Sequence, residues 1–219
     1  MNSNITSLLI SLPAVIIAIG FHEAAHAYAA YKCGDNTAKN LGRLTINPLK
    51  HIDPIGFIML FLFHFGWAKP VPINPNNFKN PKRGIVLTAL AGPLVNILLA
   101  FVFAIVLSLA MTFLELNVTF NYVLVNMINA IVSVNVCLAI FNLIPIPPLD
   151  GSKIFGGLLP YKYTHKMIEY QNIMQLVMIL LLFSGILGTI ISPIINFVYD
   201  IILELATLIC YYVFKLLGL

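Results

Sequence analysis

Charged residues are scarce in this chain. Only 8 Asp and Glu and 12 Lys and Arg occur among 219 residues, which is 9% of the sequence. A soluble globular domain carries roughly 25% charged residues. Hydrophobic residues make up 60% of the chain, and its mean hydropathy is +0.95. The composition argues against a water-soluble fold and predicts a protein embedded in a lipid bilayer.

Several other sequence features are missing. The three cysteines, Cys33, Cys137 and Cys210, form no CxxC pair and indicate no disulfide framework. The basic residues lie in loops between apolar segments, so no nucleic acid is expected as a partner. The N-terminus has neither a basic n-region nor a cleavage site, which argues against a cleaved signal peptide. No linker or soluble appendage interrupts the chain, so we expect residues 1–219 to form a single membrane domain.

Long apolar runs divide the chain into membrane spans. A crossing helix needs about 20 apolar residues. The runs predict an all-α, polytopic bundle of about five transmembrane helices, with Ser192-Pro193 separating the last two. The expected spans are 5–31, 84–113, 122–144, 173–191 and 194–217.

A shorter apolar run follows the first span. Residues 55–67 are too few for a simple crossing, and the prolines of 68–75 exclude a helix there. We therefore predict that 55–75 is a re-entrant or membrane-surface element, with a strand pair as one form it can take. Its function stays open between a structural loop and an edge that holds an unwound peptide by strand addition.

The positions of the basic residues predict the orientation. Of the 12 Lys and Arg, eight lie between the first and second spans, three between the third and fourth, and Lys215 near the C-terminus. Five crossings place all of them on one side, which the positive-inside rule assigns to the cytoplasm. The N-terminus is then expected outside and the C-terminus in the cytoplasm.

The most informative motif is His22-Glu23-Ala24-Ala25-His26, inside the first apolar run. Ionisable groups in a membrane segment cost about 2.5–3.5 kcal/mol each, so they are functional candidates. Two histidines four residues apart share one face of a helix and can bind one metal ion, and the adjacent glutamate can deprotonate a water. The motif predicts a zinc-dependent peptidase whose site lies roughly 9–15 Å inside the cytoplasmic end of the helix.

A catalytic zinc needs a third protein ligand. Asp150 is the first candidate, because it follows a proline pair where the third span breaks, and irregular backbone at membrane depth is tolerated where it lines a cavity. Asp53 is the competing candidate. Asn96 needs a polar partner in the second span and is expected to support helix packing or the site.

Two motifs together carry a family resemblance. His22-Glu23-x-x-His26 and Asn142-x-x-Pro145-x-x-x-x-Asp150-Gly151 resemble the site-2 protease family of intramembrane metalloproteases. The resemblance covers about residues 19–155 and is closest to small prokaryotic members without a PDZ or CBS domain. Further segments that look like this family are Gly34–Ala38, Gly42–Gly56, Gly66–Pro75 and Ala91–Asn96.

The resemblance implies a role for each motif residue. His22, His26 and Asp150 would bind one Zn2+ per chain, Glu23 would act as general base and acid, and Asn142 would donate a hydrogen bond to the substrate. The expected reaction is hydrolysis of a peptide bond in or near a transmembrane segment, as in regulated intramembrane proteolysis. The expected substrates are transmembrane proteins or signal-peptide-like segments in a prokaryotic cell membrane. The resemblance leaves open whether the protein forms a homo-oligomer.

A second class of function explains part of the same pattern. A membrane protein that binds or transports a metal ion without hydrolysis would use His22, His26 and Asp150 but would not need Glu23 as a base. Transporters more typically contain internal repeats, and none is recognisable in this sequence.

Overall fold

The structure is a computed structural model that describes residues 3–63, 66–159 and 169–218. Within these ranges the chain is helical, apart from loops and one isolated antiparallel bridge between Ile52 and Ala68. The α-helices in chain order are α1 (Ser3–Cys33), α2 (Thr37–Asn40), α3 (Pro54–Phe63), α4 (Pro81–Phe113), α5 (Thr119–Asn142), α6 (Asp150–Leu158), α8 (Gln171–Phe183) and α9 (Ile186–Leu217), with 3-10 turns η1 (Pro48–Lys50) and η2 (Pro75–Asn77).

Four of these helices are long and apolar enough to cross a membrane: α1 from Ile10, α4, α5 and α9. They confirm the predicted all-helical, multi-pass membrane protein. The span expected at 173–191 covers most of α8, the turn at Gly185 and the first residues of α9, and α8 itself has 13 residues. At 1.5 Å per residue α8 is about 20 Å long, less than the roughly 30 Å hydrocarbon core of a bilayer. A fifth crossing therefore stays a prediction.

The predicted break at Ser192-Pro193 is wrong. Pro193 lies inside α9, and the chain instead turns at Gly185, whose φ of 74° is in the left-handed region. A left-handed residue ends a helix, whereas a proline within a membrane helix is tolerated. The chain shows the same tolerance at Pro13 in α1 and Pro93 in α4.

The segment after α1 differs in part from its prediction. Its apolar run forms α3, which has 10 residues and is too short to cross a bilayer. In the described part of this segment, the strand pair is replaced by the single bridge of Ala68 to Ile52. Prolines at positions 70, 72 and 75 remove the donors that a longer ladder would need.

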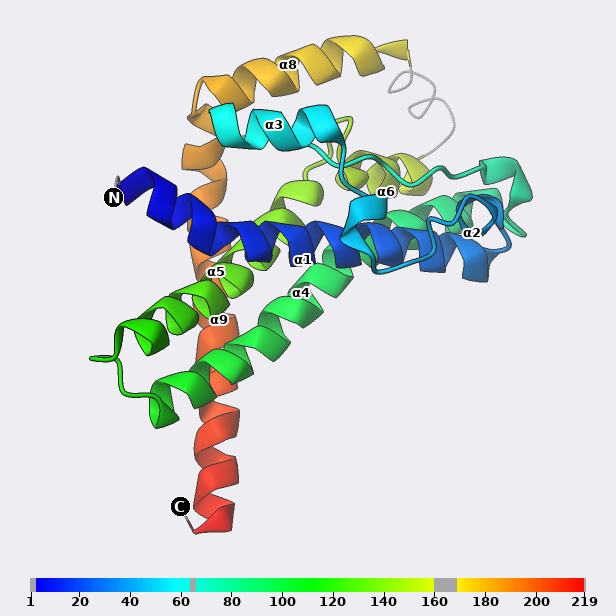
Figure 1. The fold of residues 1–219 in the computed structure, drawn as a ribbon. Coiled ribbons are helices and arrows are strands. Elements are labelled where there is room, and N and C mark those ends of the chain that lie inside the picture. The colour runs from blue at the N-terminus through cyan, green and yellow to red at the C-terminus, as the bar shows by residue number, and fades with distance from the viewer. Residues whose placement is uncertain (1–2, 64–65, 160–168, 219) are drawn as a thin grey trace.

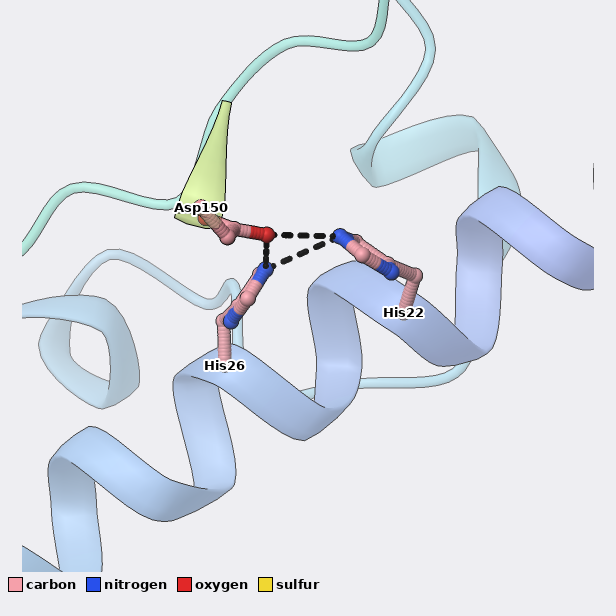
Figure 2. Close-up of side chains that lie close together, drawn as sticks. All are labelled: His22, His26 and Asp150. Carbon is pink, nitrogen blue, oxygen red and sulfur yellow. Dashed lines mark hydrogen bonds and ion pairs between the residues drawn. The ribbon is translucent and has the colours of Figure 1, made fainter. Parts of the chain in front are cut away.

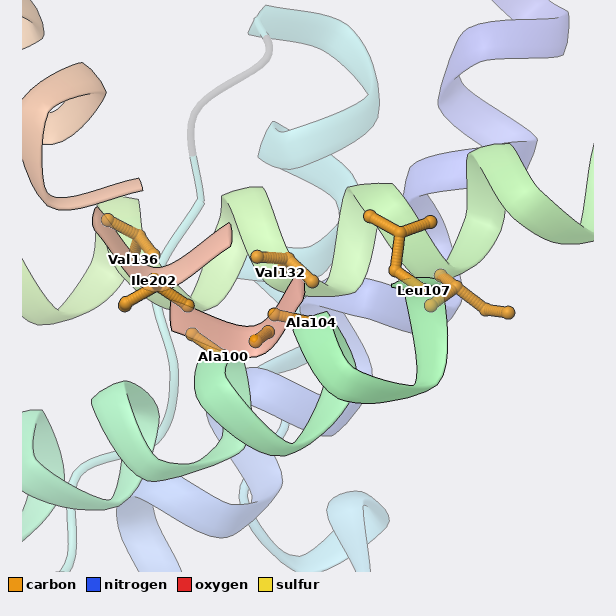
Figure 3. Packing of buried hydrophobic residues seen from close by; sticks show 8 residues of the cluster. Ala100, Ala104, Leu107, Val132, Val136 and Ile202 are labelled. Carbon is orange, nitrogen blue, oxygen red and sulfur yellow. The ribbon is translucent and has the colours of Figure 1, made fainter. Parts of the chain in front are cut away.

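Helices α1, α4 and α5 pack against one another, and α9 crosses α4 and α5 (Figure 1). The largest apolar cluster lies where α4, α5 and α9 meet (Figure 3). Alanines on α4 face branched side chains of the other two helices, and small residues let membrane helices approach closely. The residues labelled in the cluster are Ala100, Ala104, Leu107, Val132, Val136 and Ile202.

Candidate metal centre

Three polar side chains from α1 and the start of α6 point toward one another (Figure 2). His22 Nε2 lies 3.2 Å and His26 Nε2 lies 2.9 Å from Asp150 Oδ2, and the two ring nitrogens are 3.0 Å apart. All three residues are buried. The structure thus brings together two histidines from one helix turn and an aspartate 124 residues further along the sequence.

The donor set fits zinc. His22 Nδ1 faces Asn96 Oδ1 at 2.5 Å, and His26 Nδ1 faces the carbonyl of Thr88 at 2.7 Å, so each ring donates its one proton away from the centre. When both rings are neutral, two nitrogen lone pairs and a carboxylate oxygen converge, and a metal cation between them stabilises this arrangement. Ligands about 2.0–2.2 Å from a tetrahedral zinc lie about 3.3 Å apart, close to the separations seen here.

A chain of buried amides supports the first histidine. Asn96 donates from Nδ2 to Asn135 Oδ1 at 2.7 Å and to the carbonyl of Ala18 at 3.2 Å, which leaves its Oδ1 for His22. Asn135 in turn donates to the carbonyl of Ile131 at 2.8 Å. Both asparagines are fully buried. The chain links α1, α4 and α5 and fixes which nitrogen of His22 carries the proton.

Replacing Asn135 by alanine is expected to weaken zinc binding about 10-fold, because outer partners of metal ligands typically contribute 10- to 100-fold to affinity. The loss arises because Asn96 can then rotate and offer its amino group to His22. Competition with a chromophoric chelator measures the affinity. Asn126→Ala is the matched control, since Asn126 also bonds the carbonyl four residues earlier on α5. Equal zinc affinities in both variants would contradict the prediction.

Two glycines allow the helices to meet at this centre. A Cβ at Gly92 on α4 would lie 2.6 Å from ring atoms of both His22 and His26. A Cβ at Gly151 would lie 2.3 Å from the carbonyl oxygens of Leu143 and Ile144. The first glycine brings α4 against the histidines, and the second folds the loop after α5 so that Asp150 reaches them.

Glu23 lies beside the centre and contacts a loop that crosses it. Its Oε2 accepts a hydrogen bond from the backbone N–H of Val71 at 3.0 Å. Val71 stands between two prolines, so its N–H is the only backbone donor in 70–72. Arg43, which is buried, holds this loop by donating to the carbonyls of Lys69 and Pro70 at 2.5 and 3.4 Å.

The far end of the loop is held by Asp35. This buried carboxylate accepts bonds from the Asn74 N–H at 2.8 Å, from Asn77 Nδ2 at 2.8 Å and from Thr37. Burial by itself raises the pKa of Asp35, but the hydrogen bonds of Thr37, Asn77 and Asn74 outweigh it, and the pKa is lowered. Asp35 therefore stays ionised and anchors the loop over the centre.

Asn142 lies at the C-terminal end of α5 and lines the same cavity as the metal centre. Its Nδ2 donates to the carbonyl of Leu138 at 2.9 Å. An amide nitrogen carries two protons, so one donor remains. The cavity has a volume of about 480 Å3, and its polar lining consists of His22, Glu23, His26, Thr88, Asn142, Asp150 and Lys153.

The remaining candidates lie elsewhere. Asp53 Oδ1 accepts from the N–H groups of Ile55 and Gly56, so it caps α3 instead of joining the centre. His51 is fully buried under the loop, with Nε2 2.8 Å from the carbonyl of Thr45. Among the described residues, His22, His26 and Asp150 are the one group found with metal-ligand spacing. His64 and His165 lie outside the described residues.

Three features of the site were not predicted from the sequence: Asn135, the N–H of Val71, and the contact of Arg43 with the loop carbonyls. A polar residue in an apolar span is a signal for Asn135, but α5 also contains Asn121, Asn126 and Asn129. The spacing alone does not distinguish among them. The other two features depend on main-chain groups, which a sequence motif does not display.

The fold and the centre define a class: a polytopic helical membrane protein with a buried site of two histidines and one aspartate. Comparison with known families leads to the same class. The profile of Peptidase family M50 matches residues 10–185. The chain belongs to this family, the site-2 proteases, as its sequence motifs indicated.

Similar proteins carry names of the same kind. The chain is 39% identical over 192 residues to "Putative zinc metalloprotease YwhC" of Bacillus subtilis, covering 87% of this chain and 88% of that one. It is 30% identical to "Putative zinc metalloprotease Rip2" of Mycolicibacterium smegmatis and 29% identical to "Zinc metalloprotease MJ0392" of Methanocaldococcus jannaschii. These alignments cover 67% and 68% of this chain but 54% and 34% of the relatives. No solved structure matches significantly. The implied cofactor is Zn2+.

Proposed function

We propose that this protein is a zinc-dependent endopeptidase that hydrolyses a peptide bond in or near a transmembrane segment of a membrane protein. The observation that carries the proposal is that a carboxylate which is not a ligand, Glu23, lines the same cavity as the three converging ligand atoms. A metal-storage or transport site does not require such a group. Residues 1–219 would act as one intramembrane unit.

Each residue has a chemical role in this proposal. His22, His26 and Asp150 would hold zinc, which when bound would supply a water of lowered pKa, about 7, and a Lewis acid for the substrate carbonyl. Glu23 takes the proton of the attacking water and returns it to the leaving amine. The N–H of Val71 orients the Glu23 carboxylate. Asn142 donates its remaining proton to the substrate backbone or to the oxyanion.

The substrates we propose are single transmembrane helices or signal-peptide-like segments. A membrane helix satisfies its peptide groups internally, so it must unwind before a peptide bond can reach the site. The loop 66–74 supports this idea, because it runs beside the cavity. Pro70 and Pro72 supply no N–H and the Val71 N–H is bound to Glu23, so an unwound strand would pair mainly with carbonyl groups of this loop.

The direct test compares wild type with Glu23→Gln on a panel of single-span substrates, with bound zinc quantified in both. Cleavage by wild type alone supports the protease. The competing function, transport of a metal ion, predicts flux into vesicles by both proteins and cleavage by neither.

The proposed orientation has a test of its own. In a chain whose native cysteines are replaced by serine, cysteines at Lys39 and Lys79 should react with a membrane-impermeant thiol reagent only from the cytoplasmic side. A cysteine at Glu115 should react only from outside. The reason is that five of the 12 basic residues lie between α1 and α4, and three more lie in the last turn of α1 or the first turn of α4, and basic loops stay in the cytoplasm.

A tag appended to the C-terminus then decides whether α8 crosses. With N-terminus outside, a crossing α8 places the tag in the cytoplasm, and four crossings place it outside. External labelling at Lys79 would contradict the proposed orientation of α1 itself, because it would put the loop between α1 and α4 on the wrong side.

A further inference from the structure

A second cavity, of about 410 Å3, opens beside the metal centre and is apolar. Its described lining contains no charged side chain. Residues 66–68 and the first turn of α3 cover it, and faces of α1 and α5 form its walls. We call it the apolar groove, and its wall residues are Val15, Ile16, Ile19, Val134, Cys137 and Leu138.

Both walls of the apolar groove have the same four-residue spacing along their helices. On α1, Val15 and Ile19 precede Glu23 in steps of four residues, so the three lie on one helix face. On α5, Val134 and Leu138 precede Asn142 in the same steps. Each wall therefore continues, one helical turn further, into a polar residue of the proposed catalytic machinery.

The apolar groove is continuous with the site. A third cavity, of about 470 Å3, shares Ile19, Trp67, Leu138 and Phe141 with the groove. The same cavity is lined by His22, Glu23 and Asn142, which also line the cavity of the metal centre. The three spaces form one path from an apolar surface to the polar centre.

We infer that the apolar groove binds a large apolar side chain of the substrate, on the membrane-interior side of the bond that is cut. This inference rests on the proposed protease function. A peptide is the occupant because the path ends at the Glu23 carboxylate and the Asn142 amide. These groups can form hydrogen bonds with a peptide but not with a lipid acyl chain. The groove lies one to two turns toward the N-terminal half of α1 from Glu23, and the basic, cytoplasmic loop follows the other end. Specificity would thus favour Leu, Ile or Phe there over Ala or Gly.

Cys137 provides a direct probe, because it is a free, exposed thiol in the groove wall. The test uses a zinc-loaded Glu23→Gln chain with Cys33 and Cys210 replaced by serine. A synthetic single-span peptide that wild type cleaves is added, and the rate of alkylation by a small membrane-permeable thiol reagent is measured. We expect saturating peptide to slow alkylation of Cys137 at least about 10-fold.

Two outcomes of this experiment would overturn the inference and leave the protease function standing. In the first, peptide co-purifies with the variant while the rate of Cys137 alkylation stays unchanged. In the second, lipid already blocks the thiol and added peptide does not compete with it.

A substitution that fills the apolar groove provides a second test of the inference. Cys137→Trp should lower kcat/KM at least about 10-fold for a substrate with Leu on the membrane-interior side, the scale of apolar pocket discrimination. The loss should stay under about 2-fold when that Leu is Ala. Ser133→Trp, one turn earlier on α5 and outside the groove lining, is the matched control and should change neither value. Equal losses for both substrates contradict the inference. Failure of wild type to cleave any substrate removes the proposed function first, and the inference with it.

Discussion

Asp150→Ala is expected to purify without its zinc, whereas wild type should carry about one zinc per chain. Removing the aspartate leaves two histidine ligands, and a catalytic zinc site takes three protein ligands. We expect affinity to fall by at least about 100-fold, the upper end of the effect of losing an outer partner. Metal analysis after gel filtration, followed by chelator competition, measures the loss. His22→Ala and His26→Ala should behave in the same way.

Asp53→Ala is the matched control for this experiment. It makes the same change of charge and size but removes a helix cap of α3. Loss of the cap costs about 1 kcal/mol of stability, and the zinc content should equal that of wild type. Full zinc retention in Asp150→Ala together with loss in Asp53→Ala would transfer the third-ligand role to Asp53.

The centre can be predicted in large part because polar residues are rare in the apolar runs. His22, Glu23 and His26 lie inside a membrane span, where each ionisable group is energetically costly and therefore indicates a function. Asp150 stands out by its place at a helix break, and the structure brings it within 3.2 Å of both histidines. The choice of Asp150 over Asp53 needs the three-dimensional structure, since both aspartates lie close to prolines in the sequence.

The remaining features depend on packing that no local pattern encodes. The spans of α4 and α5 lie close to their predicted bounds because hydropathy marks them directly. The break between α8 and α9 is harder to place, because Pro193 is the more conspicuous residue whereas a left-handed glycine ends α8. Asn135 escapes prediction because its role is defined by Asn96, on another helix. Close approach at Gly92 is visible only when α4 is placed beside α1.

The loop over the centre links these packing features to chemistry. Arg43 and Asp35 hold its two ends through main-chain groups. Between them, Val71 presents the one N–H of its Pro-Val-Pro stretch to Glu23. Among the described residues this N–H is the one donor to Glu23, so the carboxylate is oriented while its other oxygen stays available to exchange a proton. The loop is therefore suited to position a base.

Glu23→Gln is expected to lower peptide cleavage by at least about 100-fold while zinc content and fold are retained. Glutamine keeps the size of the side chain and an oxygen that can accept the Val71 N–H, but it cannot take up a proton. General acid–base groups typically contribute 10²- to 10⁴-fold, so the expected loss is the low end of that range. Cleavage of a single-span substrate, zinc analysis and circular dichroism are measured on the same preparation.

Glu115→Gln, which removes the same charge from the α4–α5 loop, is the matched control and should cleave at the wild-type rate. The Glu23 carboxylate bonds to a backbone N–H and makes no ion pair within the described residues. Its replacement is therefore not expected to break a structural salt bridge, and a loss of cleavage at constant zinc points to proton transfer. A Glu23→Gln protein that cleaves a confirmed substrate as fast as wild type would remove Glu23 from the mechanism. If both proteins carry metal across a vesicle membrane and neither cleaves a peptide, the site moves metal and the protease assignment of this chain is wrong.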